Sequence, residues 1–288
     1  MKITDGITVT ENTPLLRQVA FLGTREQYNG KLAHLAQLAE KETWQTKDST
    51  FQNDILFQYI LHTFDRLVDE DKIIFTEDGK FASFNTGLMS ESGEDIVCML
   101  NENTNQTSTQ KWYLYGFHLV SDRYFLNFFN TIPLVADYFA SDPNKMYFNP
   151  SYEIRVDTNH IFSDNIERFP KEITEKGFSY FITLFNGAFH VIKKKIMRNY
   201  RIVVPQYFNK QITYLLPIDL DGFKCALAIE LLSNHQYRAN TILTLDMAYS
   251  NARLLMKPEA DWLDLNSIEI SSESEDALND ALEIEKEA

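Results

Sequence analysis

A run of apolar residues at helical spacing, over residues 173–199, constrains the fold of this chain more than any other feature. Its apolar side chains recur every three or four residues for about seven turns, which predicts a long amphipathic helix packed along one face. The chain after it is rich in β-branched residues and short polar turns, which predicts antiparallel strands. Because strands come in runs before and after this helix, the sequence predicts an α+β fold of mostly antiparallel sheet packed with one long helix. The strands expected after the helix are 201–204, 212–220, 225–232 and 241–245.

The first half of the chain predicts a helical portion with the outline of a winged helix. Residues 1–25 are expected to form a strand followed by a short irregular segment. An amphipathic helix over 30–44 and a stronger helix that begins at Asp54 are expected next. A hairpin over 72–84 follows, with its turn at Gly79. Acids on the helix face would repel phosphates, so this portion is predicted to be structural. Strands over 95–100 and 111–117 and a short helix over 132–139 are expected next.

Charge limits the partners that this chain can bind. Its 288 residues carry a formal net charge of −14, which argues against a protein that coats nucleic acid with a positive surface. Ten acids and one lysine lie from Asp261 onward, so this end contributes −9 of that charge. The sequence predicts three parts: an N-terminal extension with an amphipathic helix (1–49), an α+β domain (50–265) and an acidic tail (266–288) that is disordered apart from a marginal helix near 276–286.

The cysteines and the hydropathy pattern predict a soluble, cytoplasmic protein. Cys98 and Cys225 are far apart in sequence and suit neither a disulfide framework nor a metal knuckle, so buried free thiols are expected. The N-terminus lacks an apolar signal core, and Asn186 and His190 interrupt the most apolar long segment, 178–192. No membrane contact is therefore expected.

A strand-to-helix junction over Thr241–Arg253 predicts a ligand site. Asp246 stands where a helix N-cap is expected, and Tyr249 and Arg253 lie four residues apart on one helix face. An acid, a phenol and a guanidinium at a strand end can bind a phosphate or a base. Residues near other strand ends or turns are further candidates: Asn85, Gln206 and Tyr207.

The end of the long helix carries concentrated positive charge, with five cations in nine residues. Cations at a helix C-terminus complement its dipole by about 0.3–1 kcal/mol each, so a structural role is one interpretation. Five cations beside Tyr200 and Tyr207 exceed that need and favour a nucleic-acid or nucleotide contact. The five are Lys193, Lys194, Lys195, Arg198 and Arg201.

A polar cluster over 157–170 is dense in Asp, Asn and His but does not fit a calcium site. Asp157 and Asn159 match a calcium-binding loop, but its sixth place holds no glycine and Arg168 stands in the place of the glutamate. No metal is therefore predicted. His160 is a candidate general acid or base, or a histidine that only satisfies hydrogen bonds, and Arg168 is a candidate anion clamp.

The chain also contains a set of short motifs: FNTGL (84–88), WYLYGF (112–117), NHI and ERFP within 159–170, NYRIVVPQYF (199–208), ITYLLPIDL (212–220), LTLDMAYSNARLL (243–255) and KPEADWL (257–263). Together they resemble the OST-HTH-associated domain family, a family of unknown function, over residues 50–265. That family occurs beside OST-HTH, NYN-nuclease-type and cold-shock-like modules, so the resemblance implies an RNA-linked role. This chain resembles the domain standing alone. Standard catalytic and cofactor-binding signatures are absent from the sequence.

These features favour an RNA- or nucleotide-binding module. Arg253, Arg168 and the three lysines would hold phosphates, and Tyr249 or Tyr207 would stack on a base.

Two other functions stay open. The first is a phosphodiester- or nucleotide-processing enzyme, with His160 as acid or base, Asp246 as base or metal ligand and Arg253 stabilising charge. The second is a non-enzymatic interaction protein that binds a protein partner through its acidic tail.

Overall fold

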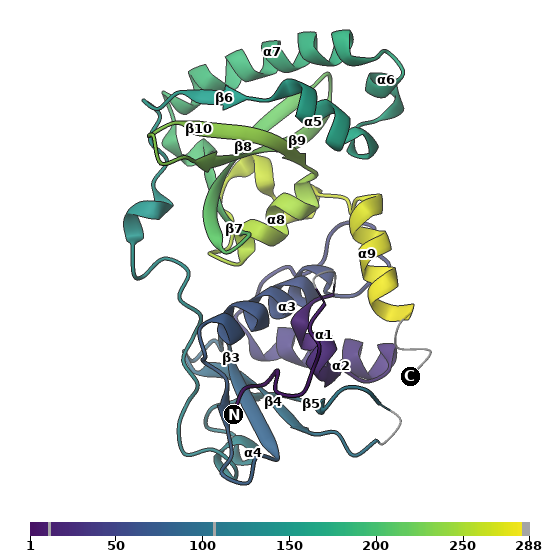
Figure 1. Cartoon of the computed structure of the whole chain (residues 1–288), viewed down its shortest axis with the longest axis vertical. Helices are drawn as coiled ribbons and strands as arrows, with labels where there is room; N and C mark the ends of the chain where they lie inside the picture. The colour runs from purple at the N-terminus through teal and green to yellow at the C-terminus, as the bar shows by residue number, and fades with distance from the viewer. Residues whose placement is uncertain (11–12, 106–107, 284–288) are drawn as a thin grey trace. The chain divides into compact units, whose positions relative to one another are not determined.

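The computed structural model of the chain describes residues 1–10, 13–105 and 108–283 and divides into two compact units. Unit 1 comprises Met1–Asp137 and the residues from Glu275 onward, and unit 2 comprises Tyr138–Ser274. Each unit is built on its own five-stranded sheet (Figure 1), which confirms the α+β class expected from the sequence. The three-part division expected from the sequence does not coincide with these units, and its boundaries stay a prediction.

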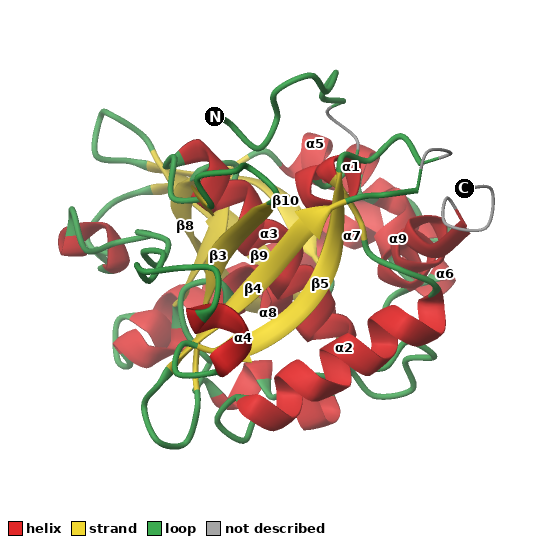
Figure 2. Ribbon diagram, turned by 90° about the horizontal axis from the view of Figure 1, so that it is seen from below, coloured by secondary structure: helices red, strands yellow, loops and turns green. Residues whose placement is uncertain are grey.

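The sheet of unit 1 has the strand order β1-β5-β4-β3-β2. Its pairs are antiparallel except for β1 and β5, which run parallel. Figure 2 shows β3, β4 and β5 side by side in a twisted sheet. The elements of unit 1 are α1 (Leu15–Val19), β1 (Ala20–Phe21), α2 (Arg25–Leu38), α3 (Asp54–Asp69), β2 (Ile74–Phe75), β3 (Phe81–Met89), β4 (Asp95–Glu102), β5 (Trp112–Leu119) and α4 (Arg123–Leu126).

The central strands of unit 1 are buried on both faces because apolar residues cover each side. Phe84 of β3 packs on Phe64 of α3, with ring centroids 5.1 Å apart. On the opposite face, Val97 and Met99 of β4 form a cluster with Phe125 and Phe129 at and after α4. Helix α3 and the β2–β3 hairpin have the helix-and-wing outline expected from the sequence.

Three local expectations in unit 1 are wrong. Instead of an initial strand and an irregular segment, α1 precedes the short strand β1, and α2 starts at Arg25 because Thr24 and Gln27 form a capping box. The helix expected over 132–139 is absent; its apolar residues, such as Leu134 at 68% exposure, form no buried face. The glycine after Asn-Thr in FNTGL predicts a turn, but the motif forms a bulge inside β3, where Gly87 has φ 75°.

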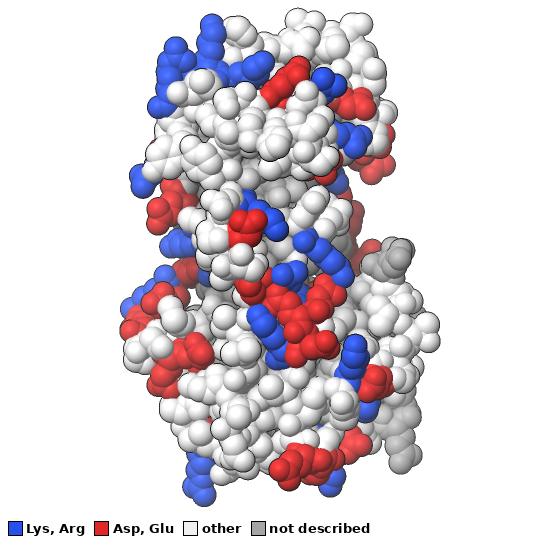
Figure 3. All heavy atoms as spheres, turned by 60° about the vertical axis from the view of Figure 1, so that its left-hand side comes forward, with Lys and Arg blue, Asp and Glu red and all other residues white. Residues whose placement is uncertain are grey.

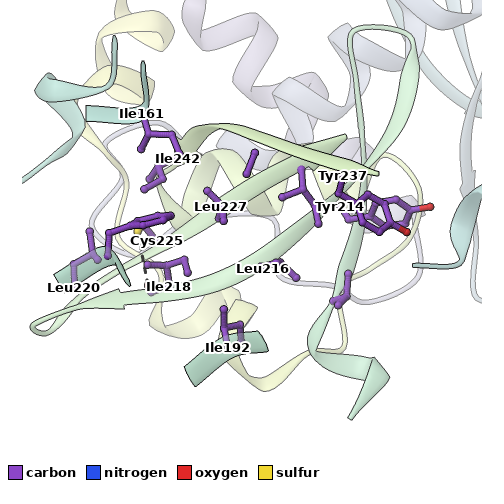
Figure 4. Packing of buried hydrophobic residues seen from close by; sticks show 14 of the residues in the cluster. Ile161, Ile192, Tyr214, Leu216, Ile218, Leu220, Cys225, Leu227, Tyr237 and Ile242 are labelled. Carbon is purple, nitrogen blue, oxygen red and sulfur yellow. Dashed lines mark hydrogen bonds between the residues drawn. The ribbon is translucent and has the colours of Figure 1, made fainter. Parts of the chain in front are cut away.

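The sheet of unit 2 has the order β6-β10-β9-β8-β7, with β6 parallel to β10 and the other pairs antiparallel. Helix α7 covers one face, and α8 lies on the other (Figure 1). Alternate residues of β8, such as Leu216 and Ile218, share a core cluster with Ile192 of α7 (Figure 4). The elements of unit 2 are β6 (Ile154–Val156), α5 (Thr158–Asp164), α6 (Lys171–Thr174), α7 (Phe178–Ile196), β7 (Val204–Phe208), β8 (Gln211–Leu220), β9 (Phe223–Leu231), β10 (Tyr237–Leu243) and α8 (Leu245–Arg253), with short 3-10 turns at Pro143–Met146, Ile166–Arg168, Tyr200–Ile202, Asp261–Leu263 and Leu265–Ser267.

Unit 2 also departs from the sequence prediction in three places. The long helix is interrupted at Gly177, whose φ of 77° separates α6 from α7. The strand expected over 201–204 is displaced, because Val204–Phe208 forms β7. Helix α8 is preceded by Thr244 as N-cap, so Asp246 lies in its first turn.

The acidic C-terminal segment contains a helix, α9 (Ser272–Glu283), where disorder with only a marginal helix was expected. Leu278 of this helix is buried, which anchors its apolar side in unit 1. Residues 284–288 of the predicted tail, like residues 11–12 and 106–107, lie outside the described residues. In the described part of the chain, every helix is too short or too polar to cross a membrane.

Candidate nucleic-acid-binding site

Unit 2 contains a hollow of about 350 Å³ beside the segment that joins α7 to β7. Tyr200 and Arg201 line it from this segment, together with Tyr147, Phe148 and Tyr214. Met256, Pro258, Glu259 and Ala260, which follow α8, form another part of the wall. The hollow therefore combines aromatic surfaces with one guanidinium, from Arg201, and one carboxylate, from Glu259.

Hydrogen bonds and ring packing hold the wall around Tyr147. The single proton of the Tyr214 hydroxyl is shared between the backbone oxygens of Lys145, at 2.8 Å, and Tyr147, at 3.1 Å. Phe148 stacks on Tyr237, with ring centroids 4.7 Å apart. Burial raises the pKa of Tyr214 to about 12, so it remains a protonated donor at neutral pH.

Two tyrosine rings at the hollow remain open to solvent. The exposed fraction is 72% for Tyr200 and 65% for Tyr147. Exposed rings at the edge of a hollow are surfaces on which nucleobases can stack, at about 1–3 kcal/mol per base.

The chain runs from the cations at the end of α7 to the wall of this hollow within nine residues, 193–201. Lys193, Lys194 and Lys195 are exposed in the last turn of α7, and Arg201 lies in the wall of the hollow. Arg198 also stabilises the end of α7, because its Nη1 donates a hydrogen bond to the Lys194 backbone oxygen at 2.6 Å. Figure 3 shows Lys and Arg side chains gathered at the top left of the view.

The negative charge of the chain is concentrated in unit 1. Unit 2 contains 15 Lys and Arg residues and 16 Asp and Glu residues, for a net charge of −1. Unit 1 accounts for the remaining 12 Lys and Arg residues and 25 Asp and Glu residues, a net charge of −13. A local cationic surface on unit 2 is therefore not opposed by the overall charge of that unit.

At the β10–α8 junction, the expected site residues are mostly buried and bound. Tyr249 is 2% exposed, so its ring offers no face to a base. Asp246 is buried, and its Oδ2 accepts hydrogen bonds from the backbone N–H and hydroxyl of Ser271. Arg253 is half-buried at the end of α8. Asp246 therefore holds Ser271, and the Tyr249 ring lies in the core.

Gln206 and Tyr207 of β7 also have partners within unit 2. The Gln206 amide is buried; it donates to Thr213 Oγ1 at 2.9 Å and accepts from Asn251 at 3.1 Å, which ties β7 to β8 and α8. Tyr207 packs edge-on against Tyr138, with ring centroids 4.7 Å apart. Gln206 is thus structural, and Tyr207 is only partly exposed.

His160 and Arg168 lie around α5. The Nδ1 of His160 is 3.0 Å from Asp164 Oδ2, and the side chain is 44% exposed. Arg168 forms an ion pair with Glu273, from Nε to Oε2 at 2.8 Å and from Nη2 to Oε1 at 2.9 Å. The anion clamp expected at Arg168 therefore holds a carboxylate of the same chain.

Asn85 belongs to unit 1 and is fully used there. Its amide nitrogen donates to Asp95 Oδ2 at 3.2 Å and to the Pro133 backbone oxygen at 3.1 Å, and its oxygen accepts from Gly87 N–H at 2.9 Å. Asn85 is 1% exposed, so it stabilises the bulge and offers no group to a ligand.

The family described as a domain of unknown function (DUF3825) matches residues 35–262. This chain belongs to that family. No curated protein and no solved structure matches the chain significantly. A family of unknown function was expected and is confirmed, while the link to OST-HTH modules stays a prediction.

The DUF3825 match includes the hollow and the end of α7 and stops before Ser271–Glu273. Within the described residues of this DUF3825 chain, no three His, Cys, Asp or Glu side chains gather as a metal site requires.

Sequence reasoning found the cations and Tyr200 but missed Tyr147 and Tyr214. Tyr147 stands in a polar loop with no periodic pattern, so no sequence signal places it in the same hollow as Tyr200.

Proposed function

We propose that this DUF3825 chain binds single-stranded RNA or a nucleotide through unit 2. A base stacks on Tyr200 and Tyr147 at the hollow, and phosphates contact the cations at the end of α7. The observation that carries the proposal is continuity: segment 193–201 supplies the lysines, and its last two residues line the aromatic hollow. This proposal assigns the base site to the segment between α7 and β7, whereas the sequence predicted it at the β10–α8 junction.

The resemblance to the OST-HTH-associated domain family supports RNA as the ligand, because that family occurs beside RNA-linked modules. The same motifs carry part of the new site: NYRIVVPQYF contains Tyr200, Arg201 and the start of β7. Stacking on tyrosine tolerates every base, and phosphate contacts carry no sequence information. The site is therefore expected to show weak sequence preference and strong dependence on salt.

Replacing Lys193, Lys194 and Lys195 with glutamine tests this proposal. Binding of a fluorescent single-stranded RNA oligonucleotide is measured by anisotropy at several salt concentrations. Each phosphate contact on a single strand contributes about 0.7 to the slope of log affinity against log salt, so losing three lowers that slope by about 2. Affinity should fall in parallel.

A matched control removes three exposed lysines of unit 1, Lys2, Lys41 and Lys80, and changes the net charge equally. This control should leave the salt slope unchanged, because those lysines contact no phosphate. Equal slopes for the wild-type protein and the α7 variant, or no RNA binding by the wild-type protein, would contradict the proposed function.

One observation favours a second candidate, hydrolysis of a phosphodiester. A carboxylate next to an exposed imidazole is the arrangement of many general acid–base sites, and Asp164 stands in this relation to His160. If His160 has this role, His160→Ala lowers RNA turnover by about a hundredfold or more and leaves RNA affinity unchanged. A wild-type protein without turnover, or a variant with full turnover, would exclude it.

A further inference from the structure

One edge of the Arg168 guanidinium is fixed by the body of unit 2. Its Nη1 donates to Asn165 Oδ1 at 2.7 Å and to the Ile242 backbone oxygen at 2.7 Å, with Thr241 Oγ1 at 3.4 Å. Asn165 is itself buried and donates to the Ile161 backbone oxygen at 2.9 Å. These contacts to α5 and β10 hold the plane of the guanidinium in one orientation.

The other edge of the guanidinium faces the acidic C-terminal segment. Nε and Nη2 donate to the two carboxylate oxygens of Glu273 in parallel, at 2.8 and 2.9 Å. The Arg168 side chain is 20% exposed, whereas that of Glu273 is 51% exposed. A rigid guanidinium thus presents two parallel donors to a carboxylate that stands at the surface. The same two donors match two oxygens of a phosphate equally well.

The segment that supplies Glu273 is held to unit 2 by few other polar contacts that the structure shows. Ser271 donates from its N–H, at 3.1 Å, and from its hydroxyl, at 2.9 Å, to Asp246 Oδ2. The segment lies beyond the residues that match the family and belongs to the most acidic end of the chain. Because water reaches Glu273, an external anion can compete for Arg168.

The distance between Arg168 and the α7 lysines limits which ligand reaches both. Phe169 packs on Phe181 in the first turn of α7, with ring centroids 5.1 Å apart. The three lysines are in the last turn, at least twelve residues further, which is about 18 Å along the helix axis at 1.5 Å per residue. A strand of several nucleotides can span this separation, and a mononucleotide cannot.

We propose that the Nε/Nη2 edge of Arg168 is a second phosphate site for single-stranded RNA, and that Glu273 occupies it as an intramolecular competitor. This inference rests on the proposed function of unit 2. It specifies the ligand as an oligonucleotide that contacts unit 2 at two places, and it gives the acidic segment an inhibitory role.

Glu273→Gln tests this inference, with Asp276→Asn as the matched control. Asp276 is an exposed acid three residues further along α9, so the control removes the same charge from the same helix. A labelled single strand of about ten nucleotides is the probe, a length within the range of single-strand sites. We expect Glu273→Gln to bind it about fivefold more tightly and to steepen the salt slope by about 0.7, the contribution of one added phosphate contact. Asp276→Asn should leave the slope unchanged.

Adding Arg168→Lys to Glu273→Gln checks the geometry of the site. Lysine keeps the positive charge but cannot make two parallel hydrogen bonds, so the gain in affinity should be lost. A double variant that keeps the full gain would show that the fork of Arg168 is not the site.

Inorganic phosphate provides a probe that does not depend on RNA. In thermal unfolding, phosphate should raise the Tm of Glu273→Gln more than that of Asp276→Asn, because a ligand that binds the folded state stabilises it. If Glu273→Gln matches Asp276→Asn in affinity and slope while the α7 lysine variant still weakens RNA binding, this inference is wrong and the proposed function stands. If no variant binds RNA, the proposed function fails, and equal phosphate effects on the two variants overturn the site at Arg168 as well.

Discussion

The hydroxyl of Tyr214 donates a hydrogen bond to the backbone oxygen of Tyr147, at 3.1 Å. Tyr214 lies in β8 with its ring in the core, while the ring of Tyr147 is exposed at the hollow. A buried strand residue thus holds the backbone of a loop residue that we expect to touch the base. This coupling explains how an irregular segment can present a fixed aromatic surface.

Tyr214→Phe should weaken RNA binding and lower the free energy of unfolding by about 1–2 kcal/mol, since it removes the hydrogen bonds to Lys145 and Tyr147. Tyr237→Phe is the matched control, because it removes one hydrogen bond, from Asn149 N–H, in the same aromatic cluster. Chemical denaturation and RNA anisotropy are measured on both. Equal losses of affinity in the two variants would mean that the contact to Tyr147 has no special part in binding.

Tyr200→Ala should lower the affinity for single-stranded RNA by about 5- to 150-fold, the equivalent of one lost base stack of 1–3 kcal/mol. Its ring is 72% exposed, so the Tm should change little. Tyr200→Phe should bind like the wild-type protein, because the ring face is kept. Tyr124, a 56% exposed tyrosine of unit 1, gives the control Tyr124→Ala. Wild-type affinity for Tyr200→Ala would remove the stacking role.

The periodic spacing of apolar residues correctly predicted the helices and strands that bury one face. It did not predict the structure of exposed segments or of a strand at the edge of a sheet. The apolar spacing of α7 and the alternation in β8 were readable because both pack into one core cluster. The strand expected over 201–204 stops before Pro205, yet Pro205 lies in β7, an edge strand of its sheet, where a missing N–H is tolerated. The apolar residues of 132–139 indicated a helix, but Ile132, Leu134 and Val135 are about half exposed or more, so packing does not select one.

The candidate site was only partly predictable for a similar reason. The cations of α7 are contiguous in sequence, so they were found. Helical spacing placed Tyr249 and Arg253 on one face, but a single helix does not reveal that Tyr249 lies on the buried side. Arg168 was expected to bind an anion, and its partner Glu273 lies 105 residues away, beyond the reach of any local pattern.

Both cysteines should react only slowly with a thiol reagent in the native protein at pH 8. Cys98 and Cys225 are free and buried, and burial raises the pKa of each thiol well above its usual range. Both should react at once in denaturant. The slow native reaction rates then report the opening of unit 1 and unit 2 separately, because each unit contains one thiol. A rapid burst from either thiol in native buffer would contradict the packing described for its strand.

The pH dependence of stability should show the effect of Asp54. Burial raises the pKa of this carboxyl above its ordinary value of 3.8, although hydrogen bonds from the Thr46 hydroxyl and N–H oppose the change. The folded state therefore holds this proton more tightly than the unfolded state. Its contribution to stability is fully present below pH 3.8 and is lost as the pH rises through the raised pKa.

Asp54→Asn removes this titration, so the free energy of unfolding of the wild-type protein minus that of the variant should fall as the pH rises from 3.5 to 7. Urea denaturation at a series of pH values measures this difference.

Asp78→Asn is the opposite case, because hydrogen bonds lower the pKa of the exposed Asp78, and the one from the Thr76 hydroxyl has the largest effect. Its contribution is present above pH 3.8 and is lost as the pH falls, so the corresponding difference should rise with pH. A difference for Asp54→Asn that rises with pH would show that the Thr46 hydrogen bonds outweigh burial at this carboxyl.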